Sequence, residues 1–506
     1  MLNKFYFFFL MVFMTLFSKQ VLAVEEQNEF DKLINDAIEP VSNKALEIVF
    51  YSIDIYGESV PLILMWLVAA SIFFSFYLKF VNVRLFKHAI DLLRGKHDKH
   101  AKGHGQINRL QALTTSLSGT VGLGNIAGVA VAISVGGPGA MVWMILMGFF
   151  GMSAKFAECT LGVKYRHETE DGKMSGGPMY YLKEGFEKLG WNHLGPVFGA
   201  FFAVCCIGGA FGGGNMFQSN QAFKMVLDAT TVDGTSFLDG KGWLFGLAMA
   251  ALVGSVIIGG IKSIANVASR IVPAMAILYL LAGSMIIAFN FEQIDDAFKA
   301  IFAGAFSTQG MAGGFLGAII QGVRRAAFSN EAGIGSASIA HAAVKTDSHI
   351  SQGVVAMLGP FIDTVVICTM TALVIVISGV YVEGNGMEGV ELTSRAFASV
   401  FSWFPYVLTI AVVLFAFSTM IAWSYYGLKA FTYLFGENNT SEMIYKIMFC
   451  FFVVIGSAAE LGNVINFTDA MIFAMAIPNI IGLYILAPEL KRDLRSYLDE
   501  VAKIKG

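Results

Sequence analysis

The sequence contains little charge for its length. Only 14% of its 506 residues are Asp, Glu, Lys or Arg, whereas 56% are hydrophobic, and the mean hydropathy is +0.65. Soluble domains carry about 25% charged residues. The composition therefore excludes a soluble globular protein and predicts a polytopic membrane protein, with no stretch left over for a soluble domain of useful size.

Cysteine is also scarce, and its number is odd. All five cysteines lie within or at the ends of apolar spans: Cys159, Cys205, Cys206, Cys368 and Cys450. This distribution excludes a disulfide framework. The chain also offers no pair of nucleophile and base and no cluster of metal ligands, so we predict that it is not an enzyme. Glycine, in contrast, is plentiful with 54 residues, which suits close packing of helices in lipid.

The first 58 residues differ from the rest of the chain. Lys4 precedes an aromatic, apolar run over 5–17, and Val21, Leu22 and Ala23 end it with small residues typical of a signal-peptidase site. We predict a signal peptide at 1–23 and an acidic, partly amphipathic periplasmic lead-in at 24–58. A single uncleaved helix over 5–22 is the alternative. Both interpretations imply a bacterial secretory route.

About eleven apolar spans follow, if each takes ~20 residues. They are expected at 59–81, 110–134, 139–163, 195–223, 243–261, 267–289, 312–340, 352–379, 396–426, 441–459 and 467–487.

The charges between the spans predict their orientation. The loops at 84–109 and 164–193 are rich in Lys and Arg and are expected in the cytoplasm, whereas 226–241, 290–300 and 380–391 are mostly acidic and are expected outside. The chain would then cross the bacterial inner membrane many times. Its N-terminus would be periplasmic after cleavage, and the tail at 488–506 would be cytoplasmic.

Two of the spans are interrupted by similar glycine-containing strings. TVGLGN at 120–125 and EAGIGS at 331–336 each place Gly-x-Gly and polar groups inside an apolar span. Freed backbone groups are tolerated in a bilayer only where they are buried in protein or line a watery cavity. A matched pair of interrupted spans in two halves indicates a transporter binding site, and packing of small residues is the alternative.

The predicted orientation makes the two interrupted spans run in opposite directions. Apart from an extra N-terminal transmembrane helix at 59–83, the spans divide into a first five-helix repeat at 110–290 and a second at 310–487. The predicted fold is therefore an all-α polytopic membrane protein with a five-plus-five inverted repeat and a binding site at the midplane between the repeats.

An interrupted helix presents two kinds of partial charge. Freed N–H groups at half-helix N-termini suit a carboxylate, and freed carbonyl groups suit a small cation. A zwitterionic α-amino acid together with Na⁺ matches both. The small residues around the interruptions leave room for only a small side chain.

Acidic groups deep inside spans are candidates for function. Glu331 adjoins the second interruption, and we expect Asp363 to serve the site or a gate. Glu158 either has such a role or forms a structural ion pair with Lys155. Further candidates are the polar patch of Asn215 and Gln218, together with Ser418, Thr419 and Trp423. Bonding of the two hydroxyl groups to their own helix is the alternative for Ser418 and Thr419, and core packing is the alternative for Trp423. Arg324 and Arg325 are expected to line an aqueous outer vestibule.

Four strings of the sequence resemble the alanine or glycine:cation symporter family (sodium:alanine symporters). They are TSLSGTVGLGNIAG at 115–128, GGPMYY at 176–181, FSNEAGIGS at 328–336 and FSTMIAWSYYG at 417–427. The resemblance runs from about residue 59 to 487. That family is similar in architecture to the bacterial leucine transporter, with the same five-plus-five repeat.

This resemblance implies roles for individual residues. One sodium site would involve Thr120, Asn125 and Ser329 beside the substrate carboxylate, and a second would involve the carbonyl groups of Ser118 and Val121 and the hydroxyl groups of Ser418 and Thr419. Gly122 and Gly124 would offer N–H groups to the carboxylate, and Phe328 would cover it. Glu331 stands where the wider fold has a small hydroxyl residue. The complete set expected to contact substrate is Thr120, Gly122, Gly124, Gln218, Phe328, Ser329, Glu331, Gly333 and Trp423.

The sequence therefore predicts a sodium-coupled symporter that imports alanine and/or glycine by alternating access, with Na⁺ as the co-transported ion and no organic cofactor. Proton coupling in the same fold, through Glu331 or Asp363, is one alternative, and a channel or receptor is another. The expected partners are the small amino acid, sodium and the lipid bilayer, with no nucleic acid. A monomer is one option, and the sequence does not decide the oligomeric state.

Overall fold

The computed structural model describes residues 39–40, 42–96, 103–169, 172–306, 314–382, 389–459 and 462–505. The predicted signal peptide at 1–23 and the first part of the lead-in, 24–38, lie outside this part of the chain. Within it, seven helices are long and apolar enough to cross a membrane, or eight if one bent pair counts as a single span. The all-α polytopic class is confirmed, and the count of eleven spans stays a prediction.

The first half of the bundle runs from a short hairpin to a 30-residue helix. Its elements are β1 (Ser52–Ile55), β2 (Glu58–Pro61), α3 (Leu62–Tyr77), α4 (Val81–Arg84), α5 (Phe86–Leu93), α6 (Arg109–Thr120), η2 (Leu123–Asn125), α7 (Ala127–Gly136), α8 (Ala140–Lys164), β3 (His167–Glu168), β4 (Met174–Ser175), α9 (Pro178–Glu187), α10 (Leu194–Phe211), η3 (Gly212–Met216), α11 (Phe217–Thr230), α12 (Gly242–Ile257) and α13 (Gly260–Phe289).

The second half ends in a 44-residue helix. Its elements are η4 (Phe291–Gln293), α14 (Ile294–Phe306), α15 (Gly314–Asn330), α16 (Ala337–His341), α17 (His349–Ala356), α18 (Leu358–Pro360), η5 (Phe361–Cys368), α19 (Thr369–Ser378), η6 (Val380–Val382), α20 (Val390–Ala398), α21 (Phe404–Phe435), α22 (Asn439–Ala458) and α23 (Gly462–Lys505).

Three predicted boundaries differ from the structure. The first span starts at Leu62 rather than at 59, because residues 58–61 pair with 52–55 in an antiparallel hairpin. The span expected at 396–426 is divided into α20 and α21, and Pro405 lies in the first turn of α21, where its missing N–H group is tolerated. The tail expected from 488 is not separate, because α23 continues through Pro488 to Lys505.

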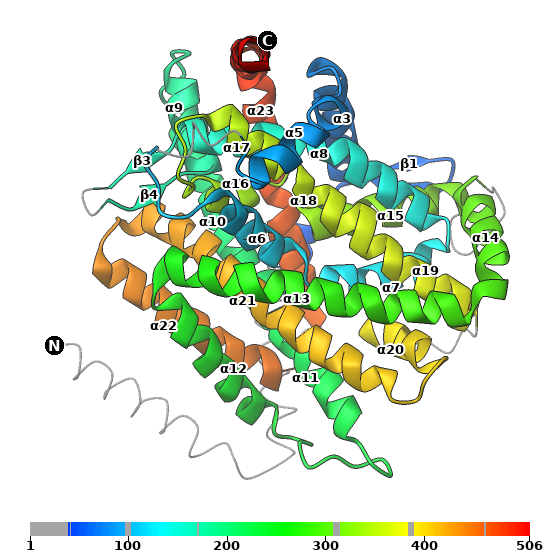
Figure 1. Cartoon of the computed structure of the whole chain (residues 1–506). Helices are drawn as coiled ribbons and strands as arrows, with labels where there is room; N and C mark the ends of the chain where they lie inside the picture. Colours follow the sequence, from blue (N-terminus) through cyan, green and yellow to red (C-terminus); the bar gives the residue numbers. More distant parts are fainter. Residues whose placement is uncertain are drawn as a thin grey trace.

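The helices that carry the two interruptions lie inside the bundle. α6 contacts α13 and α21, α7 contacts α15, and α15 and α16 both contact α8. In Figure 1, α13 and α21 cross the front of the molecule, and these two helices are in contact. α13 leaves Ile277 and Leu281 58% and 60% exposed, as expected for a helix whose outer face meets lipid.

Segments predicted on the same side of the membrane lie at the same end of the molecule. Figure 1 shows α5, α9 and the C-terminal end of α23 together at the top, whereas α14, α20 and the segment after α11 lie toward the right and the bottom. This grouping agrees with the division of the loops by charge. The assignment of one end to the cytoplasm stays a prediction.

Candidate functional site

The first interruption separates α6 from α7. The helix axis turns by 58° between Arg109–Thr120 and Leu123–Gly136. Gly122 is extended at the break, and its N–H group donates to Asn125 Oδ1 at 2.8 Å, so a side chain satisfies a backbone donor that the helix has lost. A Cβ at Gly122 would lie 2.4 Å from Thr419 Oγ1, and only glycine fits there.

The second interruption separates α15 from α16. Glu331, Gly333 and Gly335 all have positive φ, at 54°, 83° and 99°. Positive φ is uncommon for a residue other than glycine, so Glu331 is held in place by its surroundings. Asn330 Oδ1 accepts a hydrogen bond from the N–H group of Ala332 at 2.9 Å. Both predicted interruptions are therefore present.

A small cavity lies between the two interruptions. Its volume is about 20 Å³, which is room for about one water molecule. Seven of the nine residues expected to contact substrate line it, together with Thr419, and Ser329 and Gly333 do not. The lining residues are Gly119, Thr120, Gly122, Gly124, Gly213, Gln218, Phe328, Glu331, Thr419, Trp423 and Ile472.

Two polar atoms that face this region have no hydrogen-bond partner within the described part of the chain. They are Gln218 Oε1 and Thr419 Oγ1, both buried. A buried polar atom without a partner is costly, so its presence in a cavity indicates a group that a ligand would satisfy. The Gln218 amide is already oriented, because its Nε2 donates to the carbonyl of Gly213 at 2.9 Å.

Aromatic rings and glycines define the walls of the cavity. Trp423 Nε1 donates to the carbonyl of Gly119 at 3.2 Å, and its ring packs against Gly214, where a Cβ would lie 2.3 Å from the Trp423 Cβ. Phe328 lies just before the second interruption, and its ring is 3.4 Å from the Cβ position of Gly124 in the first. Gly213 was not predicted as a lining residue, although it belongs to the Gly212–Gly214 run that adjoins Gln218.

A buried polar cluster surrounds Asp363, which lies in the π-helical segment η5. Asn125 Nδ2 donates to Asp363 Oδ1 at 2.7 Å, and Ser329 Oγ donates to Asp363 Oδ2 at 2.8 Å. Thr364 Oγ1 bonds to the same Oδ2 at 2.8 Å. Residues predicted for a sodium site thus meet an acid that the sequence suggested for a gate. Carboxylate, amide and hydroxyl oxygens are ligands that hard cations prefer.

Thr120 contributes differently from the sequence-based expectation. It lines the cavity, but its hydroxyl group bonds within α6, to the carbonyl groups of Ser116 at 3.3 Å and Leu117 at 3.4 Å. The structure therefore brings Asn125 and Ser329 to Asp363, and it leaves the hydroxyl of Thr120 on its own helix.

The residues predicted for a second cation site lie along the contact between α6 and α21. Ser118 Oγ donates to the carbonyl of Ser418 at 2.6 Å, and Ser418 Oγ donates to the carbonyl of Phe415 at 3.0 Å. Val121 follows on α6 and is fully buried. The Ser118 hydroxyl group therefore joins α6 to α21, and the Ser418 hydroxyl group bonds within its own helix. Among the described residues, the hydroxyl group of Thr419 has no partner.

Glu158 contacts the second interruption from α8. It pairs with Lys155 at 3.0 Å, and both side chains are at most 1% exposed. Glu158 Oε2 accepts from the N–H group of Gly333 at 3.1 Å, and Lys155 Nζ donates to the carbonyl of Glu331 at 3.0 Å. The ion pair thus holds both ends of an unwound turn, which explains why Gly333 lies outside the cavity.

Asn479, on α23, is a further contact that sequence reasoning missed. Its Nδ2 donates to the carbonyl of Gly333 at 2.8 Å, and its Oδ1 accepts from the hydroxyl group of Tyr181. A Cβ at Gly335 would lie 3.0 Å from the Asn479 amide carbon. The signal in the sequence was a single Asn after Pro478 inside an apolar span.

Arg324 and Arg325, near the second interruption, both contact other helices or side chains of the protein. Arg324 pairs with Asp469 on α23 at 2.8 Å and lies over the ring of Phe50, 4.8 Å from its centroid. The aliphatic part of Arg325 lies 3.8 Å from the Cβ position of Gly128. Asp469 was not predicted, and it is only 5% exposed.

The guanidinium group of Arg166 joins the segment that precedes α6 to the segment that follows α16. Arg166 donates to the carbonyl groups of Ala342 at 2.9 Å and Val344 at 2.5 Å, and also to those of His104 at 2.7 Å and Thr346 at 2.8 Å. Burial lowers the pKa of Arg166 from its usual value. The group is surrounded by four backbone acceptors from two segments that lead to the two interruptions.

The chain shares its fold with solved transporters. It is similar to the crystal structure of MhsT in complex with L-phenylalanine, with a TM-score of 0.54 and 16% identity over 76% of this chain and 89% of that one. The leucine-transporter-like fold expected from the sequence is confirmed by this similarity.

The chain is also similar in sequence to transporters from other organisms. It is 41% identical to the sodium/alanine symporter AgcS of Methanococcus maripaludis over 88% of this chain and 95% of that protein. It is 35% identical to the probable sodium/glutamine symporter GlnT of Bacillus subtilis over 86% of this chain and 87% of that protein.

A model of one family matches almost the whole described chain, residues 43–505. The family is one of transporters and not of enzymes, and its members couple amino-acid transport to sodium. The match covers both interrupted spans, the Asp363 cluster and the cavity between them. This chain therefore belongs to the sodium:alanine symporter family.

Proposed function

We propose that this symporter imports a small neutral amino acid, alanine or glycine, together with Na⁺ by alternating access. The observation that carries the proposal is the cavity between the two interruptions, where Gln218 Oε1 and Thr419 Oγ1 are buried and have no hydrogen-bond partner among the described residues. A zwitterion bound there would meet the backbone at the two interruptions and these two side-chain oxygens.

The size of the cavity favours the smallest amino acids. At about 20 Å³ it is far below the roughly 300 Å³ of a typical drug-sized site. Trp423 and Phe328 border it, and glycines face these rings, so each added side-chain carbon must displace a packed ring. Glycine and alanine require the least displacement, and glutamine requires considerably more.

The Asp363 cluster supports sodium as the coupled ion. Asn125, Ser329 and Asp363 form a connected set of oxygen-bearing groups beside the first interruption. The proposed cation binds among these groups, next to the carboxylate of the substrate. Thr419, with its unpartnered hydroxyl group, would complete a second cation position together with the Val121 carbonyl group.

A single sodium ion can supply the driving force. One Na⁺ that moves down ~100 mV contributes about 2.3 kcal/mol, and a tenfold sodium gradient contributes about 1.4 kcal/mol. Together they could sustain an accumulation of several hundredfold for a neutral zwitterion. The end of the bundle that carries α9 and the C-terminal part of α23 would face the cytoplasm, because the segments at this end are rich in Lys and Arg.

Uptake by the purified protein in proteoliposomes tests the proposal. An inward Na⁺ gradient should drive accumulation of labelled alanine above its outside concentration, and glycine should compete better than glutamine or phenylalanine. Accumulation that needs a proton gradient and not sodium would contradict sodium coupling. Equilibration without accumulation would indicate a channel.

A further inference from the structure

We propose that a second amino-acid site lies apart from the central cavity, between the β3–β4 hairpin and the turn that joins α21 to α22, and that it takes a free zwitterionic α-amino acid. A pocket of about 340 Å³ opens there. This volume falls within the range of about 300–1,000 Å³ that small-molecule sites occupy. Both cations and carboxylates line the pocket, among them Lys173, Lys429, Glu437 and Glu442.

Lys429 provides the end of the site that would bind a carboxylate. Lys429 is only 6% exposed. Its Nζ donates to Ser175 Oγ at 2.8 Å, and no carboxylate of the described residues lies within 4.0 Å of it. A buried ammonium group normally has an anionic partner. With one neutral acceptor, two of its three hydrogens remain for a ligand.

Glu437 provides the opposite end. Its Oε1 accepts hydrogen bonds from the hydroxyl groups of Ser175 and of Tyr180, the latter at 3.0 Å. Both donors are neutral, and within the described chain no cation lies within 4.0 Å of this carboxylate. Lys429 and Glu437 contact the same hydroxyl group, so an ammonium and a carboxylate stand two hydrogen bonds apart. An α-amino acid carries a carboxylate and an ammonium group, which complement this pair of charges.

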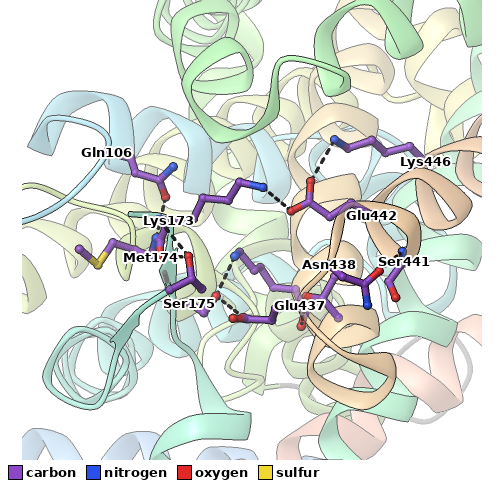
Figure 2. A network of polar contacts seen from close by, with 12 residues as sticks. Gln106, Lys173, Met174, Ser175, Glu437, Asn438, Ser441, Glu442 and Lys446 are labelled. Atoms are coloured by element: carbon purple, nitrogen blue, oxygen red, sulfur yellow. Dashed lines mark hydrogen bonds and ion pairs between the residues drawn. The ribbon is translucent and has the colours of Figure 1, made fainter. Parts of the chain in front are cut away.

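The other charged lining residues already have partners, because Glu168 Oε2 lies 3.1 Å from His104 Nδ1 and Lys173 pairs with Glu442. This leaves Lys429 and Glu437 as the site. Figure 2 shows Glu442 between Lys173 and Lys446, at 2.7 Å and 3.5 Å. Because the pocket holds charges of both signs, a polyanion such as a nucleotide would meet carboxylates, and a divalent cation would meet ammonium groups. A zwitterion carries one charge of each sign, so it can place its carboxylate beside an ammonium group and its ammonium group beside a carboxylate.

The location of the pocket gives the site a role in regulation. Lys429 is six residues beyond Trp423 on α21, about 9 Å along the helix, so the pocket lies near the central cavity but is separate from it. Met174 precedes Ser175, and its N–H group donates to Gln106 Oε1 at 2.9 Å, just before the start of α6. A ligand that joins α21 to this hairpin would restrain α6, and on the cytoplasmic side assumed in the proposed function it would slow import when the amino acid accumulates.

Equilibrium binding of labelled alanine to the full chain in lipid nanodiscs tests this inference. The central site should require Na⁺, whereas the Lys429 site presents ammonium groups that repel a cation and should bind without it. We expect two bound alanines per chain with Na⁺ and one without. Lys429→Met and Glu437→Gln should each weaken the sodium-independent binding at least tenfold and leave the sodium-dependent binding intact.

Two controls separate this inference from the proposed function. Lys446→Met removes a charge beside the pocket without altering its lining, and both binding events should remain. Gly122→Ala should remove only the sodium-dependent event. Absence of sodium-independent binding, or its persistence in both Lys429→Met and Glu437→Gln, would overturn the inference. Absence of only the sodium-dependent event would contradict the proposed function instead.

Discussion

The side-chain amide of Asn125 donates to Asp363 twice, to its carboxylate Oδ1 at 2.7 Å and to its backbone carbonyl at 3.2 Å. The first interrupted span is thereby fixed to η5. Because η5 is a π-helical segment, a wide turn at this point brings an acid to the break. Asp363 is consequently the only carboxylate that directly contacts both Asn125 and Ser329 in the described chain.

We predict that Asp363→Asn weakens sodium binding. The substitution preserves the shape of the side chain but removes the negative charge that would balance a cation. The sodium concentration for half-maximal alanine uptake should rise at least tenfold in proteoliposomes. Glu391→Gln, at an exposed carboxylate in the first turn of α20, is the control and should behave as wild type. Unchanged sodium dependence in Asp363→Asn would remove the carboxylate from the proposed site.

Thr419→Val tests the second cation position. Valine keeps the branched shape and removes only the hydroxyl group that lacks a partner in the structure. We expect a several-fold higher sodium requirement with no loss of thermal stability. Thr409→Val is the matched control on the same helix, since the Thr409 hydroxyl bonds only to the carbonyl of Pro405. Equal effects of the two substitutions would mean that the Thr419 hydroxyl has no special role.

Gly122→Ala should abolish transport without unfolding the chain. The added methyl group would lie 2.4 Å from Thr419 Oγ1, inside the cavity lining. Initial uptake should fall at least tenfold, while gel filtration and helix content by circular dichroism stay as in wild type. The control is Gly359→Ala, at a helical glycine whose Cβ position has no atom within 4 Å. Normal uptake by Gly122→Ala would contradict the assignment of the cavity.

Lys155→Met should destabilise the fold strongly. The substitution leaves Glu158 buried without its cation, and removing one partner of a buried pair costs about 3–5 kcal/mol. The thermal midpoint in detergent should fall by several degrees. Adding Glu158→Gln to the same variant removes the uncompensated charge, so the double variant should recover part of the loss. A double variant that is less stable than Lys155→Met would contradict this account.

The sequence was sufficient to predict the fold and both interruptions. Hydrophobic runs of about 20 residues indicate membrane helices, and Gly-x-Gly inside such runs indicates broken ones. Gly122 and Gly333 follow from this pattern, whereas Phe328 was expected only from the resemblance to the family. The expected arrangement failed mainly at helix ends, because the pairing of 58–61 with 52–55 and the start of α21 depend on local turn chemistry that hydropathy does not report.

Contacts between distant helices could not be predicted from the sequence. Asp363 is 238 residues from Asn125, and Asn479 is 146 residues from Gly333. Which acid meets which amide depends on helix rotation and on the extra residue of a π turn. Sequence reasoning could identify Asp363 and Glu158 as costly groups inside a membrane, but their partners required the packed structure.

Arg166 has a consequence for how this end of the bundle can move. One side chain binds carbonyl groups on the chain entering α6 and on the chain leaving α16. Backbone hydrogen bonds join the same two stretches, from the Gln106 N–H group to the Ala343 carbonyl at 2.8 Å and from the Lys345 N–H group to the Ile107 carbonyl at 2.7 Å. The stretches can therefore separate only after these bonds and the Arg166 contacts have all broken. A passage between the two stretches would therefore open in one step, and both broken helices would be released in the same event.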